Sequence, residues 1–188
     1  MDYQIDKSAF ANLSHSIIEQ MLSMKAGRAA EERLKKCCGG ELTPETVSIL
    51  DVETIRKCGI SERKAQSLMS LADYALNHNL ENMKNAQEEE VYETLLKLPG
   101  IGKWTCDMFL LFYLCRPDIL PTEDGALRRI FRWLYRADLS SSDSQNAVCA
   151  LWKPFSSTAV RYLYRALNAG IMQTMKRPEK LWQEANSI

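Results

Sequence analysis

The segment Leu98-Pro99-Gly100-Ile101-Gly102 lies between two helical stretches and has the composition of a tight turn. Proline ends the preceding helix, and glycine adopts the left-handed backbone angles that such a turn needs. The pattern is helical again from Lys103 onwards, so the first N–H groups of the second helix lack intrahelical acceptors. Such a helix end can bind an anion, and Lys103 adds a positive charge there. The alternative is an ordinary tight connection between two helices.

Two adjacent carboxylates, Glu123 and Asp124, stand at the predicted start of another helix, after an apolar helix and a short loop. An ionised carboxylate in a fixed position can stabilise a developing positive charge and direct a water molecule. The alternative is structural, because an aspartate before the first helical residue accepts backbone N–H bonds and stabilises the helix by about 1 kcal/mol.

Other kinds of chemistry have little support in the sequence. None of the cysteines forms a Cys-x-x-Cys pair, and none pairs with a histidine at zinc spacing. We therefore expect free buried thiols and no metal held by side chains. The two histidines, His15 and His78, have no matching partners for a histidine-based catalytic site. The cysteines are Cys37, Cys38, Cys58, Cys106, Cys115 and Cys149.

The elements that must position these residues are predicted to be helices. Apolar residues recur at three-to-four spacing, and no segment shows sustained strand alternation. Capping residues predict helix starts at Ser8, Thr43-Pro44, Asp51 and Ser61, and three glutamates favour another from 88. The first apolar stripe comprises Phe10, Leu13, Ile17, Met21 and Met24. We expect an all-α protein of about ten short helices.

Length and composition agree with this fold class. The chain has 188 residues, of which 46% are hydrophobic and 26% charged, which is enough to bury a core in one domain or two small lobes. The longest uncharged apolar run, 108–115, is far shorter than the ~18 residues of a transmembrane helix. The acidic, polar N-terminus is not a secretory signal.

The net charge is zero, which argues against a polybasic protein, but the charge is unevenly distributed. Residues 1–96 hold 11 basic and 16 acidic side chains, whereas residues 97–188 hold 13 basic and 8 acidic ones. A basic half can face phosphate groups, and a solvated basic helix face is the alternative. Arg128, Arg132 and Arg136 share one face of a predicted helix, where either phosphate contact or structural ion pairing is expected.

Together these segments resemble the helix-hairpin-helix DNA glycosylase superfamily. Residues 98–105, Leu-Pro-Gly-Ile-Gly-Lys-Trp-Thr, look like that family's hairpin, and Asp124 falls where the family carries its catalytic aspartate. Residues 17–23 are similar to its early Gln-x-x-Ser segment. Residues 152–155, Trp-Lys-Pro-Phe, followed by Ser157 and Ala159, are similar to its late Trp-Lys/Arg-Pro-aromatic segment.

Position 104 distinguishes the branches of this family. Bifunctional members carry a Schiff-base lysine there, whereas this chain has Trp104, and Lys103 points about 100° away on the helix. The iron–sulfur members have four cysteines near the carboxyl end, and only Cys149 lies in the last 70 residues here. The chain therefore resembles the monofunctional 3-methyladenine glycosylase II type, as a minimal core without the β domain that precedes some members and without an iron–sulfur cluster.

The resemblance implies a two-lobed helical bundle with the active-site cleft between the lobes. We expect one lobe at 24–115, ending in the helix-hairpin-helix motif, and a second built from 1–23 plus 116–188. The implied partner is double-stranded DNA containing a damaged base, which a monomer binds without any membrane. The expected location is the cytoplasm, in association with the nucleoid if the source is bacterial, or the nucleus if it is eukaryotic.

The resemblance also assigns roles to residues. Asp124 is the expected catalytic carboxylate, with Glu123 as a less favoured substitute, and a monovalent cation is expected at the hairpin carbonyls. The expected base pocket is Trp104, Tyr164 and Met108; the DNA-binding hairpin is Leu98, Gly100, Gly102, Lys103 and Thr105; and the wedge that fills the vacated stack is Met21 with Gln20. Core packing is the alternative for Met21, Trp104 and Tyr164.

The sequence departs from the family pattern at three positions. Met108 stands where a pocket tyrosine can occur, Gly125 where a large aliphatic residue is usual, and Ser156 where an arginine is common. The leading hypothesis is excision of alkylated purines. The alternatives are a glycosylase for deaminated, oxidised or mismatched purines, and a helix-hairpin-helix module that binds DNA without catalysis.

Overall fold

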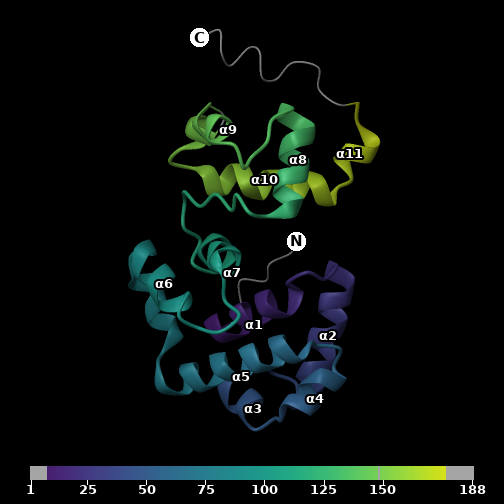
Figure 1. Cartoon of the computed structure of the whole chain (residues 1–188), viewed down its shortest axis with the longest axis vertical. Helices are drawn as coiled ribbons and strands as arrows, with labels where there is room; N and C mark the ends of the chain where they lie inside the picture. Colours follow the sequence, from purple (N-terminus) through teal and green to yellow (C-terminus); the bar gives the residue numbers. More distant parts are fainter. Residues whose placement is uncertain (1–7, 148, 177–188) are drawn as a thin grey trace. The chain divides into compact units, whose positions relative to one another are not determined.

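The computed structural model describes residues 8–147 and 149–176, and divides the chain into two compact units (Figure 1). The regular elements of the described residues are all helical, which confirms the predicted fold class. In the same residues, no helix is long and apolar enough to cross a membrane. We describe each unit by itself, with the boundary between Leu114 and Cys115.

The N-terminal unit, whose described residues are 8–114, contains the helices that carry the hairpin. Its elements in chain order are α1 (Ala9–Glu19), α2 (Met24–Cys37), α3 (Pro44–Ser48), α4 (Val52–Lys57), α5 (Glu62–Asn77), the 3-10 helix η1 (Leu80–Asn85), α6 (Glu88–Leu95), α7 (Lys103–Met108) and the π-helical turn η2 (Phe109–Tyr113). Helix α7 continues directly into η2, so the hairpin is followed by one uninterrupted helical segment.

The helix starts predicted from capping residues are confirmed. Ser8, Asp51 and Ser61 each accept a hydrogen bond from a backbone N–H of the first turn of α1, α4 and α5. Thr43 caps α3 in a reciprocal capping box with Thr46, and a proline follows it at the first helical position. Because these signals act within one turn, they can be identified from local sequence alone.

Helix α1 lies in the core of the N-terminal unit, packed against α2, α5, α7 and η2. Its buried side chains Leu13, Ile17 and Ile18 pack in the same core as Leu68 and Leu71 of α5. This placement corrects the expected lobe 1–23 plus 116–188, since α1 belongs with residues up to 114. The apolar stripe of α1 is complementary to α5, and spacing alone does not reveal which neighbour covers it.

The C-terminal unit, described over 115–147 and 149–176, packs α8 (Gly125–Tyr135) against α10 (Ser156–Asn168). Its other elements are α9 (Ser142–Ala147), η3 (Cys149–Trp152) and α11 (Ile171–Thr174). The Trp152 ring meets Phe131 of α8 edge-on, with centroids 5.9 Å apart. Trp152, the first residue of the late motif, thus packs against α8, the helix that Asp124 caps.

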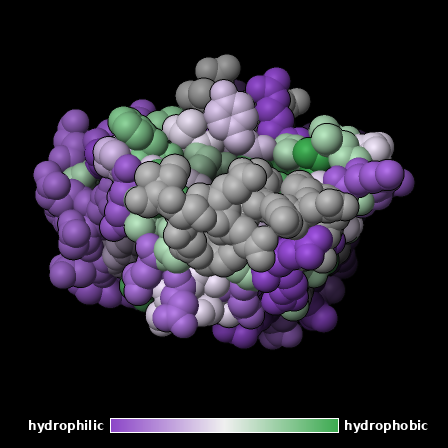
Figure 2. Space-filling model, turned by 90° about the horizontal axis from the view of Figure 1, so that it is seen from above, coloured by the Kyte–Doolittle hydropathy of each residue, from purple (hydrophilic) through white to green (hydrophobic). Residues whose placement is uncertain are grey.

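The start of α10 is fastened to the loop that precedes α8. The Ser157 hydroxyl accepts from the Ile119 N–H at 2.9 Å and donates to the Arg116 carbonyl at 2.6 Å. The Ser156 hydroxyl and N–H both donate to the Asp118 carboxylate. The serine that departs from the family pattern therefore connects the start of α10 to the loop before α8. Figure 2 shows one face of the molecule, on which hydrophobic residues are dispersed among hydrophilic ones.

A partly buried charge cluster joins α1 to α2. The His15 ring lies 2.5 Å from the Glu31 carboxylate and 3.3 Å from that of Glu19, and Lys35 bonds the other oxygen of Glu31 at 3.0 Å. Burial lowers the pKa of His15, but hydrogen bonds and charge from the two glutamates outweigh burial and raise that pKa from 6.5 to about 9. His15 therefore acts as a cation between two carboxylates at neutral pH.

Stability should depend on the charge of His15. Because its pKa is higher in the folded chain than in the unfolded chain, its stabilising contribution is complete below pH 6.5 and is lost as the pH rises through about 9. Over this range the free energy of unfolding of wild type should fall by about 3 kcal/mol more than that of His15→Gln. Urea unfolding at several pH values measures both slopes, and parallel slopes would contradict the assignment.

Candidate functional site

The hairpin between α6 and α7 is held by its own backbone. The N–H of Leu98 donates to the carbonyl of Leu95 at 3.0 Å, and the N–H of Ile101 donates to that of Leu98 at 3.2 Å. Gly102 caps α7 without any side-chain hydrogen bond. The first N–H groups of α7 thus have no capping side chain, and Gly102 and Lys103 at this helix start are exposed.

Gly100 is fixed by conformation and by space. Its φ is +78°, in the left-handed region, and a Cβ atom at this position would lie 2.0 Å from the Ser67 hydroxyl of α5. No side chain fits there without moving α5 or the hairpin. At Gly102, by contrast, φ is −108° and a Cβ would meet nothing within 4 Å. The two hairpin glycines thus have different reasons to be glycine.

Gln20, the C-cap of α1, connects the turn between α1 and α2 to the hairpin. Its side-chain amide donates to the Gly100 carbonyl and to the Thr105 hydroxyl, each at 3.0 Å. Thr105, which was expected to belong to the DNA-binding hairpin, is only 1% exposed. Both residues are instead positioned to hold the hairpin against α1.

Met21 follows Gln20 in an unusual backbone conformation. Its φ is +57°, which is rare for a residue other than glycine, and its side chain is completely exposed. The helix ends at Glu19, so the stripe predicted to continue through Met21 stops before it. Core packing is therefore wrong as the explanation of Met21, and a large apolar side chain projects from the turn into solvent.

Lys64 of α5 also holds this turn, a role that was not predicted from the sequence. Its ammonium group donates to the carbonyls of Ile18 and Gln20, at 2.7 and 2.5 Å, where the carbonyls of α1 lack intrahelical partners. Partial burial lowers the pKa of Lys64. No local pattern indicates this role, because the acceptors lie more than 40 positions away in the chain.

Lys103 has a different environment from the one expected. Its ammonium group bonds both carboxylate oxygens of Asp107, at 2.9 and 2.8 Å, and lies 5.6 Å from the centroid of the Tyr92 ring. Asp107 is fully buried and also accepts from the Tyr92 hydroxyl at 2.5 Å, and burial together with this carboxylate raises the pKa of Tyr92. Nearly half of the Lys103 side chain stays exposed, so structural pairing does not hide its charge.

Asp124 occupies the N-cap position of α8. One carboxylate oxygen accepts from the Leu127 N–H at 2.6 Å, and the side chain is partly exposed. The structural alternative for this residue, helix capping, is therefore present, and a carboxylate at a helix N-terminus interacts favourably with the helix dipole. Glu123 is exposed. A side chain at Gly125 would meet open space within 4 Å, so the departure from the family pattern leaves room beside Asp124.

The three expected pocket residues differ in burial. Trp104 is partly exposed on α7, whereas Met108 of the same helix and Tyr164 of α10 are buried. The N-terminal unit contains Trp104, the hairpin, Gln20 and Met21. The C-terminal unit contains Asp124 and Tyr164.

The arginines of α8 are partly used in structural contacts. The Arg128 guanidinium donates to the Thr122 carbonyl at 2.7 Å, and Arg132 lies 3.5 Å from the Asp138 carboxylate. Arg136 ends α8 in a left-handed conformation. Arg132 thus makes the structural ion pair that was the alternative to phosphate contact, whereas Arg128 is held by a backbone carbonyl.

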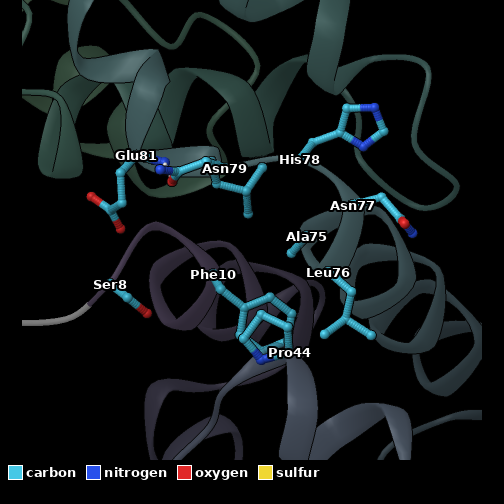
Figure 3. A pocket seen from close by; sticks show the side chains of 10 residues that line it. Ser8, Phe10, Pro44, Ala75, Leu76, Asn77, His78, Asn79 and Glu81 are labelled. Carbon is cyan, nitrogen blue, oxygen red and sulfur yellow. Dashed lines mark hydrogen bonds between the residues drawn. The ribbon is translucent and has the colours of Figure 1, made fainter.

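A cavity of about 340 Å³ lies elsewhere in the N-terminal unit (Figure 3). Its lining includes Phe10 and Pro44, but its polar groups serve the local fold: Glu81 accepts from the Ala9 N–H, and Asn79 caps η1. It contains no residue of the hairpin or of the turn at Met21. Across residues 8–147 and 149–176, no group of three His, Cys, Asp or Glu side chains could hold a metal ion.

Comparison with known proteins gives a consistent result. A model of the HhH-GPD superfamily, base excision DNA repair proteins, matches residues 14–155. DNA-3-methyladenine glycosylase 1 of Schizosaccharomyces pombe is 31% identical over 183 residues, covering 93% of this chain and 79% of that protein. A solved structure of the 3-methyladenine DNA glycosylase of that organism with abasic DNA has a TM-score of 0.78 at 30% identity, covering 93% of this chain and 84% of that one. DNA-3-methyladenine glycosidase of Bacillus halodurans has a TM-score of 0.75 at 30% identity, covering 89% and 79%.

The two hairpin glycines should respond differently to substitution. Gly100→Ala should lower the free energy of unfolding by about 2–4 kcal/mol, because the added methyl group collides with Ser67 and φ is positive. Gly102→Ala is the matched control and should change stability by less than about 1 kcal/mol. Chemical unfolding of both variants measures the difference, and equal losses would show that the contact with Ser67 is not restrictive.

Proposed function

Since the chain belongs to the HhH-GPD superfamily of base excision DNA repair proteins, we propose that it is a monofunctional DNA glycosylase that hydrolyses the N-glycosidic bond of alkylated purines of the 3-methyladenine type. The observation that carries this proposal is the match over 93% of the chain to a glycosylase named for 3-methyladenine. The Gln20 contact and the exposed Met21 support it, because together they join an anion-binding hairpin to an apolar wedge.

The hairpin would grip one DNA phosphate through the backbone N–H groups at the start of α7. Helix starts bind anions in this way without a charged side chain. The carbonyls of Leu98 and Gly100 each accept one hydrogen bond and have a second lone pair, so they could also hold the expected monovalent cation. Such a cation would add positive charge beside the phosphate. The remaining exposed charge of Lys103 contributes salt-sensitive attraction.

The target base must leave the helix before its sugar can be reached. Met21 would enter the stack and occupy the space that the extruded nucleotide vacates, as large apolar side chains do in other proteins that unstack bases. Its complete exposure and left-handed backbone suit this role. An apolar side chain held in water forgoes the stabilisation that burial would give, and contact with stacked bases would restore it.

The chemistry needs one carboxylate. Alkylation of a ring nitrogen gives the purine a formal positive charge, which makes it a good leaving group, so no general acid is required. The ionised Asp124 would stabilise the positive charge that develops on the sugar and direct water to it. The bond between the sugar carbon and the purine breaks, the electron pair leaves with the base, and water adds to the sugar carbon and loses a proton.

The remaining residues would select the base and its surroundings. The partly exposed Trp104 offers an aromatic face to a cationic purine, an attraction that strengthens as water is excluded. Met108, on the same helix as Trp104, and Tyr164 of α10 remain candidates for contact with the base, and both are buried within their own units. The protein would act as a monomer, in the bacterial cytoplasm at the nucleoid or in a eukaryotic nucleus.

A lesion panel tests the activity. Duplexes containing single 3-methyladenine, 7-methylguanine, hypoxanthine or 8-oxoguanine residues are incubated with the full chain, and base release is quantified by chromatography. We expect release of the alkylated bases, no strand break without added alkali, and no covalent adduct after borohydride. Release of hypoxanthine or 8-oxoguanine alone would favour the alternative lesions, and binding without any release would favour a non-catalytic module.

Substitution of Asp124 separates its charge from its capping role. Asparagine caps a helix as well as aspartate does, so Asp124→Asn should change the free energy of unfolding by only a few tenths of a kcal/mol. Its single-turnover excision rate should fall by at least about a hundredfold, because the ionised oxygen is lost. Glu123→Gln is the matched control, with the same charge change one residue earlier, and should stay near the wild-type rate. Similar rates for wild type and Asp124→Asn would exclude Asp124 as the catalytic group.

A further inference from the structure

The turn between α1 and α2 is held from two sides. On one side the Gln20 amide reaches the hairpin at Gly100 and Thr105. On the other side the Lys64 ammonium group bonds the carbonyls of Ile18 and Gln20. One residue, Gln20, thus contacts the hairpin through its side chain and α5 through its carbonyl oxygen, and Met21 is the next residue in the chain.

The conformation of Met21 requires such support. A left-handed backbone is unfavourable for a residue with a Cβ atom, and it persists only where the surroundings fix it. The carbonyl of Gln20 belongs to the peptide unit that leads into Met21, so its bond to Lys64 orients that unit directly. Hydrogen bonds to charged donors are stronger than neutral ones, which makes an ammonium group effective at this position.

We propose that Lys64 is a positioning residue for base extrusion, which holds the Gln20 peptide so that the hairpin and Met21 engage DNA as one rigid piece. The proposal rests on the proposed function. Lys64 does not contact the reacting atoms and acts through Met21, so its removal changes how well the wedge stays in place. The alternative is that Lys64 only stabilises the end of α1.

A double-mutant cycle distinguishes these roles. The measured quantity is the preference of the full chain for a duplex with one tetrahydrofuran abasic-site analogue over the same duplex with an intact base pair, by fluorescence anisotropy. Lys64→Met should lower this preference about tenfold, because residues of one hydrogen-bond network typically have coupling energies that correspond to a change of this order. In a Met21→Ala background Lys64→Met should lower it no further. A loss of similar size in both backgrounds would show a purely structural role and overturn the proposal.

Matched variants control for charge and folding. Lys57→Met removes the same charge from an exposed position on α4 and should weaken binding to both duplexes equally, leaving the preference unchanged. If Lys64→Met does not fold, Lys64→Gln, which keeps one donor group, should retain the fold and lower the preference about threefold. An unchanged preference in a folded Lys64→Gln would refute the proposal. A wild type without any preference for the abasic analogue would instead contradict the proposed base extrusion.

Discussion

The contact of the Gln20 amide with the hairpin is the interaction on which the rest of the site depends. It joins the end of α1 to Gly100 and Thr105, which lie 80 and 85 residues further along the chain. This contact connects the turn that carries Met21 to the hairpin between α6 and α7. In the proposed function, a phosphate bound at the hairpin would therefore fix where Met21 stands, which is the geometry that extrusion of a base would require.

The charged residues around this contact mostly serve to hold the backbone. Lys64 caps carbonyls of α1, and Lys103 pairs with the buried Asp107 beside Tyr92. Arg128 likewise donates to a backbone carbonyl in the C-terminal unit. In the proposed function, recognition of phosphate would thus fall chiefly to backbone N–H groups, which is consistent with a chain of zero net charge. The proposed chemistry would need one carboxylate, that of Asp124, whose helix-capping bond also fixes its direction.

The parts of the structure that local signals determine could be predicted from the sequence. Ser8, Thr43, Asp51 and Ser61 cap helices because each needs only the N–H groups of the following turn. Gly100 and Gly102 marked the hairpin, although the contact with Ser67 that makes Gly100 necessary was not visible. The spacing of Met21 resembled that of a core residue, since periodicity does not show where a helix stops.

Features that depend on distant partners could not be predicted. The carbonyl that Lys64 bonds lies 46 positions away in the chain. The pairing of Lys103 with Asp107 depends on the burial of that carboxylate, which the sequence does not show. The membership of α1 in the N-terminal unit depends on which helices cover its apolar face. Family resemblance named Gln20 and Thr105 as part of the site, but their mutual contact, and hence their shared role, required the structure.

The most direct measurement is a crystal structure of the chain bound to a duplex with a single tetrahydrofuran abasic-site analogue. We expect a phosphate at the N–H groups of Gly102 and Lys103, the Gln20 bond to Gly100 retained, Met21 inside the stack at the lesion, and the Asp124 carboxylate facing the abasic sugar. A complex in which the hairpin contacts a phosphate but Met21 lies outside the duplex would contradict the coupling of hairpin and wedge.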